Sequence, residues 1–234
     1  MSGRAPTLRR SVTSSPVDDI PYTVRRSTRA RRVRISVDPA GRVEVVLPQR
    51  AREREAAAAV TELRPWIERH RRAARGVQET IAARAGTVPL LGSSLLLRAE
   101  PRRTRVHRRG DVLLVPAGEQ QAAAVERWYR RTARAEIAPR LDVAVAALGV
   151  GYAALTIRNQ RTRWGSCSTT GAISFNWRLL LAPEEILDYV VWHEACHLRV
   201  MDHSTRFWTL LEQHVPDYRV LRRWPRDHGA TLVL

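Results

Sequence analysis

The sequence predicts an α+β fold in which short strands and hairpins alternate with helices. Three observations support this prediction. Apolar residues alternate with arginine over residues 22–47, and an Ala-rich helical run begins at Ala51. A second hairpin pattern precedes a nearly all-apolar helical segment at 183–200. A chain of 234 residues is long enough for one sizeable core and a smaller appendage.

The N-terminal part divides into a tail and a hairpin followed by helices. Residues 1–19 are polar and rich in Ser and Thr, so we expect a disordered basic tail. Strands are expected over 22–26, 31–37 and 42–47, with a turn at 38–41. The inward face of this hairpin carries Val33, Ile35, Val37, Val43, Val45 and Leu47, and the other face carries Arg31, Arg32, Arg34 and Arg42.

Helices are expected next over 51–63 and 66–85, separated by Pro65 and stopped by Gly86. Short strands follow around Leu90 and over 95–98, 104–107 and 112–115. The segment 119–148 is helical again, with a bend or break expected at Pro139. We therefore expect an N-terminal hairpin and helical region over 20–86 and a second domain over 87–234.

The most informative part of the second domain begins at residue 155. A strand over 155–158 is followed by two antiparallel strands joined at 169–171, of which the second alternates Ile173 and Phe175 with Ser174 and Asn176. A buried helix is predicted over 183–200, and Ser204 is a good N-cap for a last amphipathic helix over 205–214.

The segment H-E-A-C-H at 193–197 carries the clearest chemistry. His193 and His197 lie four residues apart, so on a helix both imidazoles can reach one tetrahedral ion. Glu194 lies beside them, where a water on that ion would sit. Three protein ligands and a water are the composition of a catalytic zinc site. The motif therefore predicts a metal-dependent hydrolase.

The residues leave more than one candidate for the third ligand. We favour His203, which requires the helix to stop near 201–204. That break contains no glycine, so a non-glycine residue is expected to adopt an unusual conformation there. Glu212 and His214 are rivals for the position, and Asp202 could orient a ligand imidazole. Cys196 is expected to pack as a small buried side chain.

Charge and cysteine content indicate which binding partners and which cellular location to expect. The formal net charge is +17, and all forty basic residues are Arg. A surplus of this size favours contact with polyanions, nucleic acid above all, and a basic but solvated surface is the alternative. No run is apolar for long enough to span a membrane, and the N-terminus lacks the apolar core of a secretory signal. Two cysteines make no disulfide framework, which fits the cytoplasm.

Several linked motifs resemble the YgjP-like metallopeptidases, which are related to the SprT-like and WLM proteases. They are R-W-G-S-C-S at 163–168, F-N-W-R-L at 175–179, Y-V-V-W-H-E-A-C-H-L at 189–198 and M-D-H-S at 201–204. One departure is Ala195, where the family usually has Leu.

The resemblance implies a zincin-like catalytic domain of the gluzincin or metzincin kind, with an active-site helix and an antiparallel sheet. It also implies Zn²⁺ on His193, His197 and His203, with Glu194 as catalytic base. The SprT-like and WLM relatives cleave proteins attached to DNA, so DNA-associated protein substrates are one expectation.

Peptide hydrolysis is the function that the sequence favours, with a protein or peptide as the substrate. Candidates for substrate binding or transition-state stabilisation are Arg163, Trp164, Asn176 and Tyr218. Two alternatives stay open. One is a nucleic-acid-binding protein with a structural or vestigial zinc site, and the other is a metal-dependent hydrolase of a non-peptide bond.

Overall fold

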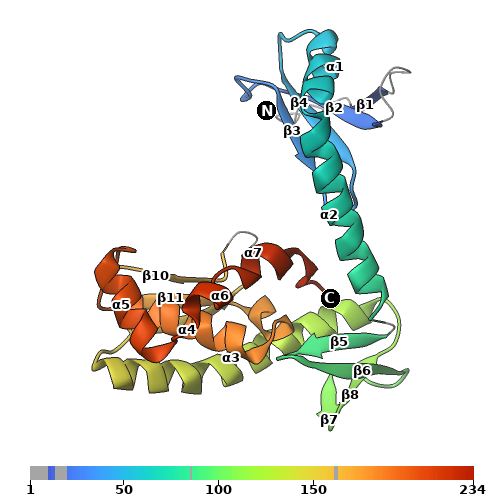
Figure 1. Ribbon diagram of the computed structural model, residues 1–234. Helices are drawn as coiled ribbons and strands as arrows, with labels where there is room; N and C mark the ends of the chain where they lie inside the picture. The colour runs from blue at the N-terminus through green and yellow to red at the C-terminus, as the bar shows by residue number, and fades with distance from the viewer. Residues whose placement is uncertain (1–9, 14–19, 85, 161–162) are drawn as a thin grey trace, which may run out of the picture. The chain divides into compact units, whose positions relative to one another are not determined.

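Sheets and helices occur together in both of the units into which the chain divides, Met1–Ala83 and Arg84–Leu234 (Figure 1). The computed structural model describes residues 10–13, 20–84, 86–160 and 163–234. The predicted α+β class is confirmed by small mixed sheets and helices in each unit. The assignment of the two regions as separate domains, divided at residue 86, stays a prediction.

The first unit is a four-stranded sheet with two helices. The strands lie in the order β1-β2-β4-β3. The elements are β1 (Arg10–Thr13), β2 (Tyr22–Ser27), β3 (Arg34–Val37), β4 (Val43–Pro48), α1 (Glu53–Glu62) and α2 (Arg64–Ala82). The turn between β3 and β4 is closed by Asp38, whose side chain accepts hydrogen bonds from the backbone of Ala40 and Arg42. Gly41 supplies the positive φ of 76° that this turn needs.

One face of this sheet packs on the helices. Val43, Val45 and Leu47 are at most 1% exposed and cluster with Ala56, Val60 and Ile67 of the helices, while Val33, Ile35 and Val37 are partly buried against them. The inward face predicted for the hairpin is therefore confirmed.

The prediction of a disordered tail over 1–19 needs correction at four residues. Residues 1–9 and 14–19 lie outside the described residues. Between them, Arg10–Thr13 form β1, which pairs antiparallel with β2. Sheet edges offer unpaired backbone groups, so a polar composition alone did not exclude pairing.

The second unit holds two sheets, of strand order β5-β6-β8-β7 and β10-β11-β9. Its strands are β5 (Thr87–Leu90), β6 (Ser93–Glu100), β7 (His107–Arg109), β8 (Val112–Pro116), β9 (Ala154–Arg158), β10 (Gly165–Cys167) and β11 (Ala172–Asn176). Its helices are α3 (Gln120–Leu148), α4 (Glu184–His197), α5 (Thr205–His214), α6 (Tyr218–Leu221) and α7 (Trp224–His228), with 3₁₀ turns η1 (Trp177–Leu181) and η2 (Gly229–Thr231). Helix α4 packs along α3 (Figure 1).

The sheet beside α4 is mixed, whereas a purely antiparallel sheet was expected. Strands β10 and β11 form the expected antiparallel hairpin, but β9 pairs with β11 in parallel. The same arrangement recurs as β2 with β4 and as β6 with β8. In each case the first strand of the following hairpin serves as the crossover that a parallel pair requires. Hairpin signals in the sequence are local and do not reveal this longer-range pairing.

Helix α3 runs through Pro139 without a break over its 29 residues. The break expected there does not occur. Pro139 has no N–H to donate, so the carbonyl of Ala135 loses its helical hydrogen bond. Both residues are exposed, and water can hydrogen-bond to that carbonyl instead. Among the described helices, none combines the length and apolarity of a membrane span.

Tyr129 links α3 to β5, and its removal gives a first prediction. Its ring is fully buried and its hydroxyl donates a hydrogen bond to the carbonyl of Pro89, and burial raises the pKa of this hydroxyl. We expect Tyr129→Phe to lower the free energy of unfolding by about 1–3 kcal/mol, because the partly buried carbonyl of Pro89 loses its donor. Urea denaturation measures this change. Tyr152→Phe is the control, since its hydroxyl bonds to Asp142 at the surface. Equal effects of the two substitutions would contradict the assignment.

Candidate metal centre

Helix α4 brings the first two histidines together. It begins after Pro183 with Glu184 and Glu185 in its first turn, where acidic side chains favour the positive end of the helix dipole. Most of its remaining residues are buried, as the apolar pattern predicted. His193 and His197 lie on one side of this helix, and their Nε2 atoms are 3.2 Å apart.

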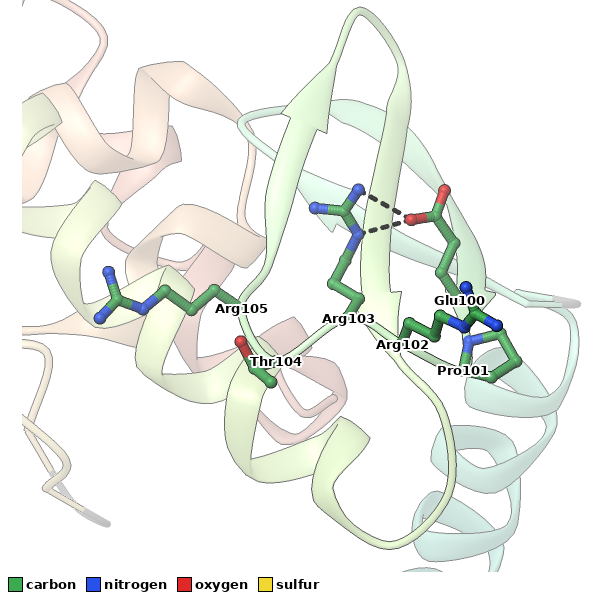
Figure 2. Close-up of a pocket in the computed structure, with 6 residues that line it drawn as sticks. All are labelled: Glu100, Pro101, Arg102, Arg103, Thr104 and Arg105. Carbon is green, nitrogen blue, oxygen red and sulfur yellow. Dashed lines mark hydrogen bonds and ion pairs between the residues drawn. The ribbon is translucent and has the colours of Figure 1, made fainter.

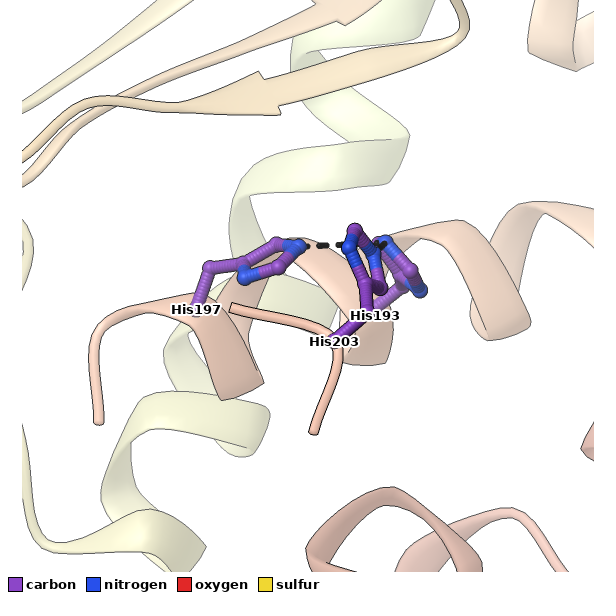
Figure 3. Close-up of side chains that lie close together, drawn as sticks. All are labelled: His193, His197 and His203. Atoms are coloured by element: carbon purple, nitrogen blue, oxygen red, sulfur yellow. Dashed lines mark hydrogen bonds between the residues drawn. The ribbon is translucent and has the colours of Figure 1, made fainter. Parts of the chain in front are cut away.

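His203 joins this pair from the connection between α4 and α5. Its Nε2 lies 3.1 Å from the Nε2 of His193, and one ligand atom from each of the three rings lies within 4.8 Å of the others. Figure 3 shows the three imidazoles turned toward one another. Behind them lies the buried ring of Phe207, with its centroid 4.9 Å from those of His193 and His203 and 4.5 Å from that of His197.

The protonation of His197 follows from its second ring nitrogen. Nδ1 lies 3.0 Å from the carbonyl oxygen of Val200. Because a carbonyl can only accept, Nδ1 carries the proton and Nε2 presents its lone pair to the other two rings. A backbone carbonyl in this role is a common partner of metal-binding histidines.

Asp202 does not orient an imidazole through a hydrogen bond. Its Oδ1 accepts a hydrogen bond of 3.0 Å from the backbone nitrogen of Ser204.

The helix break before His203 uses ordinary backbone conformations. Helix α4 ends at His197, and the backbone nitrogens of Arg199 and Val200 both bond to the carbonyl of Cys196. The left-handed non-glycine residue expected at 201–204 does not occur. Among the described residues, positive φ at a non-glycine position is found at Leu91. The helix ends earlier than expected, which leaves enough residues to turn without a left-handed one.

The rivals for the third position have other partners. Glu212 lies 3.7 Å from Arg219 in an ion pair, and the ring of His214 stacks on Trp192 at 4.2 Å. Cys196 is fully buried in the core, where burial raises the pKa of its thiol to about 12. This location agrees with the packing role expected from the sequence.

Burial disfavours the charged form of His193 and His197. Burial, followed by the neighbouring His197 and His203, lowers the pKa of His193 to about 3, and burial also lowers the pKa of His197. The Nε2 of His193 faces two other ring nitrogens, and one nitrogen cannot satisfy both of them by sharing protons. The buried Nδ1 of His193 has no hydrogen-bond partner among the described residues. The donor set therefore fits a divalent cation that prefers nitrogen.

Glu194 is a buried residue of the pocket lining, and its side chain lies close to the backbone of β10. Its side chain is buried at 6% exposure. A Cβ added to Gly165 would come within 2.5 Å of its Oε1 and 2.6 Å of its Cγ, so glycine alone leaves room for this carboxyl group. Burial raises the pKa of Glu194 to about 8, against the lowering effect of the Arg163 charge. A cation on the histidines would lower this pKa again.

These groups line one pocket of about 250 Å³. Its lining includes the three histidines, Glu194, Arg163 and the β10 residues Gly165, Ser166 and Cys167. A larger hollow of about 580 Å³ lies in the turn 100–105, where Arg103 Nε donates a hydrogen bond to Glu100 and its Nη2 forms an ion pair with the same carboxylate oxygen (Figure 2). It shares no lining residue with the histidine pocket, and none of its residues belongs to the metal-binding cluster found among the described residues.

Comparison with known families agrees with this geometry. A family profile described as YgjP-like, metallopeptidase domain, matches residues 31–228. The chain belongs to the YgjP-like metallopeptidase family. This membership implies a divalent metal and a protein or peptide substrate for the YgjP-like chain.

Two further comparisons complete this result. The crystal structure of the metallopeptidase zymogen of Pyrococcus abyssi abylysin is 26% identical over 40% of this chain and 92% of that chain, with a TM-score of 0.35. A search among curated proteins gave no match.

The four other candidate residues of the YgjP-like chain differ in their placement. Arg163 lines the pocket, and its charge acts on Glu194. Trp164 packs instead against Gly229. A Cβ added to Gly229 would lie only 2.8 Å from Cζ2 of Trp164. The amide nitrogen of Asn176 donates to the carbonyls of Gln160 and Arg163, at 2.7 and 3.3 Å.

The oxygen of the Asn176 amide is also occupied, because it accepts a hydrogen bond from the backbone of Arg178. Tyr218 stacks on Trp208 at 5.3 Å, and its hydroxyl accepts a hydrogen bond from Arg219. Of these four residues, Arg163 is the one that lines the histidine pocket.

Sequence reasoning missed three supporting residues. Gly165 makes room for Glu194, and Val200 orients His197 through its carbonyl. Trp208 donates a hydrogen bond of 2.9 Å from Nε1 to the carbonyl of His203 and so holds the third histidine's backbone. A glycine inside a strand pattern is a known sign of close approach, so Gly165 offered a signal. The other two contacts depend on the path of the chain and gave none.

Proposed function

We propose that this chain is a zinc-dependent metallopeptidase in which Glu194 is the general base. The observation that carries the proposal is the convergence of three histidine Nε2 atoms beside the buried Glu194 carboxyl group. Three nitrogen donors on an open pocket match the ligand set of catalytic zinc, whereas structural zinc sites are usually closed by four protein ligands. This openness favours a catalyst over a protein with a structural zinc.

The ligand spacing supports a metzincin-like arrangement over a gluzincin-like one. His193, His197 and His203 have the spacing of the metzincin motif, in which a glycine occupies the position of Val200. The described cluster includes no carboxylate among its possible ligands. Val200 takes the glycine's place because the turn after α4 needs no positive φ there.

Zinc bound here would acidify a coordinated water and polarise the scissile carbonyl. Glu194 accepts the proton of the attacking water and passes it to the departing amine nitrogen as the C–N bond breaks. Gly165 fixes where that carboxyl group lies. Arg163, at the pocket rim, is the candidate donor to the developing oxyanion. We assign Trp164, Asn176 and Tyr218 to supporting this site rather than to touching substrate.

Strand β10 is the candidate docking edge for the substrate backbone. It is the outer strand of the order β10-β11-β9, and three of its residues line the pocket. An extended peptide can pair with such an edge. An edge that recognises peptide backbone favours peptide bonds over other hydrolysable bonds.

Two finer points complete the proposal. Protein substrates associated with nucleic acid fit the net charge of +17. A cytoplasmic location fits two free thiols, Cys167 and Cys196.

Metal analysis combined with a peptidase assay tests the proposed function. We expect the purified protein to hold about one zinc per chain and to lose cleavage of an unstructured protein substrate when a chelator removes it. His203→Ala should weaken zinc binding by about 100-fold or more. Removing a group that only hydrogen-bonds to a metal ligand already lowers metal affinity by about 10–100-fold, and this substitution removes a ligand itself.

His214→Ala is the matched control, because that ring stacks on Trp192 outside the cluster. Zinc retention by His203→Ala, or cleavage that survives complete metal removal, would refute the proposal.

A further inference from the structure

A strongly basic segment of the first unit has no part in the metal site. Residues 25–37 contain six arginines and no acidic residue. They comprise the end of β2, the connection to β3 and the whole of β3. Over residues 1–83 as a whole, eighteen arginines stand against nine acidic residues. Six of the unit's eighteen arginines therefore lie in one stretch of thirteen residues that contains no acidic residue.

Four of these arginines are available to a ligand. Arg29, Arg31, Arg32 and Arg34 are exposed, and their side chains make no ion pair within the described part of the unit. Arg25 differs, because it pairs with Glu44 at 3.3 Å. Like charges gathered without acidic partners repel one another, and a bound polyanion relieves that repulsion.

The strand register sets two of the arginines on either side of an apolar residue. Val46 of β4 pairs with Arg25 of β2 and with Arg34 of β3, so these three residues form one row across the sheet. The opposite face of the sheet is covered by the packing of Val43, Val45 and Leu47 on the helices. The row therefore lies on the face that the unit's own helices leave open.

A hollow of about 220 Å³ lies on this face. Its lining includes Arg25, Arg29 and Arg34 together with Ser27, Ser36 and Glu44. Guanidinium groups match the geometry of phosphate oxygens, and hydroxyl groups add neutral donors. The Glu44 carboxylate faces the same hollow, and its pairing with Arg25 reduces its repulsion of an anion.

We propose that the open face formed by β2, β3 and their connection binds the phosphodiester backbone of nucleic acid. The inference rests on the part of the proposed function that places substrates on nucleic acid, and not on the peptidase chemistry. Arginines spread over a connection and a strand suit successive phosphates better than one isolated phosphate.

A lipid surface is the less favoured partner, because insertion needs apolar residues beside the basic ones. In the described part of this unit, Leu63 is the exposed large apolar residue, and it lies between α1 and α2.

The corresponding connection of the second unit is a weaker candidate. It joins β6 to β7 and is also rich in arginine, but Arg103 is held there by Glu100 (Figure 2). Part of the positive charge of this connection is therefore already paired within the protein, and we place the proposed binding face on the first unit.

The test is binding of the full-length, zinc-loaded protein to a fluorescent DNA duplex of about 20 bp over a series of salt concentrations. The test variant carries Arg29→Gln, Arg31→Gln and Arg34→Gln. We expect its affinity to fall by at least about tenfold at low salt and its salt slope to shrink by about 2–3, since each lost phosphate contact removes about 0.9. Changing the same three residues to Lys should retain most of the salt-dependent binding.

The matched control carries Arg69→Gln, Arg72→Gln and Arg75→Gln on α2, which are also exposed and remove the same charge. We expect it to bind nearly as well as the unchanged protein. The proposal is overturned if the unchanged protein shows no salt-dependent DNA binding, if both Gln variants weaken equally, or if anionic phospholipid vesicles bind and DNA does not.

Peptide cleavage is measured in parallel to separate the two proposals. DNA binding without cleavage would remove the proposed peptidase function alone, and cleavage without DNA binding would remove this inference alone.

Discussion

Glu194→Gln is expected to retain zinc and to lower peptide hydrolysis by about 10²–10⁴-fold, the usual contribution of a general base. The amide occupies nearly the same space beside Gly165, so the pocket keeps its shape. The three histidines lie outside the change, and metal content should stay the same. An amide cannot accept the proton of the attacking water, which is the reason for the loss.

The measurement is the rate of cleavage of a protein substrate at equal zinc occupancy. Glu212→Gln is the control, since that side chain is half-exposed and pairs with Arg219 away from the cluster. Near-normal activity of Glu194→Gln would show that another group activates the nucleophile. A loss of zinc from this variant would instead show that the carboxylate is a ligand.

Gly165→Ala is expected to lower hydrolysis by about 10²-fold through displacement of the same carboxyl group, the size of effect that a misplacement of about 1 Å can have. The added Cβ would meet Oε1, Cγ and Cδ of Glu194 at 2.5, 2.6 and 2.8 Å. These distances involve most of the side chain, so rotation of its end does not relieve the clash. Because Glu194 is buried, it has little space into which to move.

This prediction separates positioning from folding. Zinc binding and the unfolding transition should change much less than the rate. Gly151→Ala is the matched control in the same unit, because an added Cβ there meets no atom within 4 Å. Normal activity of Gly165→Ala would mean that the strand moves easily and that this glycine has no role in placing the base.

Predictions from local patterns agreed best with the structure. His193 and His197 share a helix, so their spacing alone places both rings on one side. The hairpin at β10 and β11 and the inward valines of β4 likewise follow from alternation over a few residues. Helix ends were less exact, since α4 stops three residues before its predicted end.

Predictions that depend on distant segments were weaker. The residues left three candidates for the third position, and the path from α4 to α5 brings His203 to the pair. The amide of Asn176 is used to hold the backbone at Gln160 and Arg163, which its position in a strand could not reveal. The parallel pairing of β9 with β11 joins segments that the hairpin separates, so no turn signal marks it.

By itself, the sequence determined the α+β class, the helix that carries two histidines and a glutamate, and the resemblance to a metallopeptidase family. Each of these depends on spacing within one element or on motifs that stay together in the chain. The tertiary structure alone decided that His203 meets His193, that Gly165 leaves room for Glu194, and that Phe207 lies behind the three rings. These contacts join separate elements, and packing between elements fixes distances that local spacing leaves open.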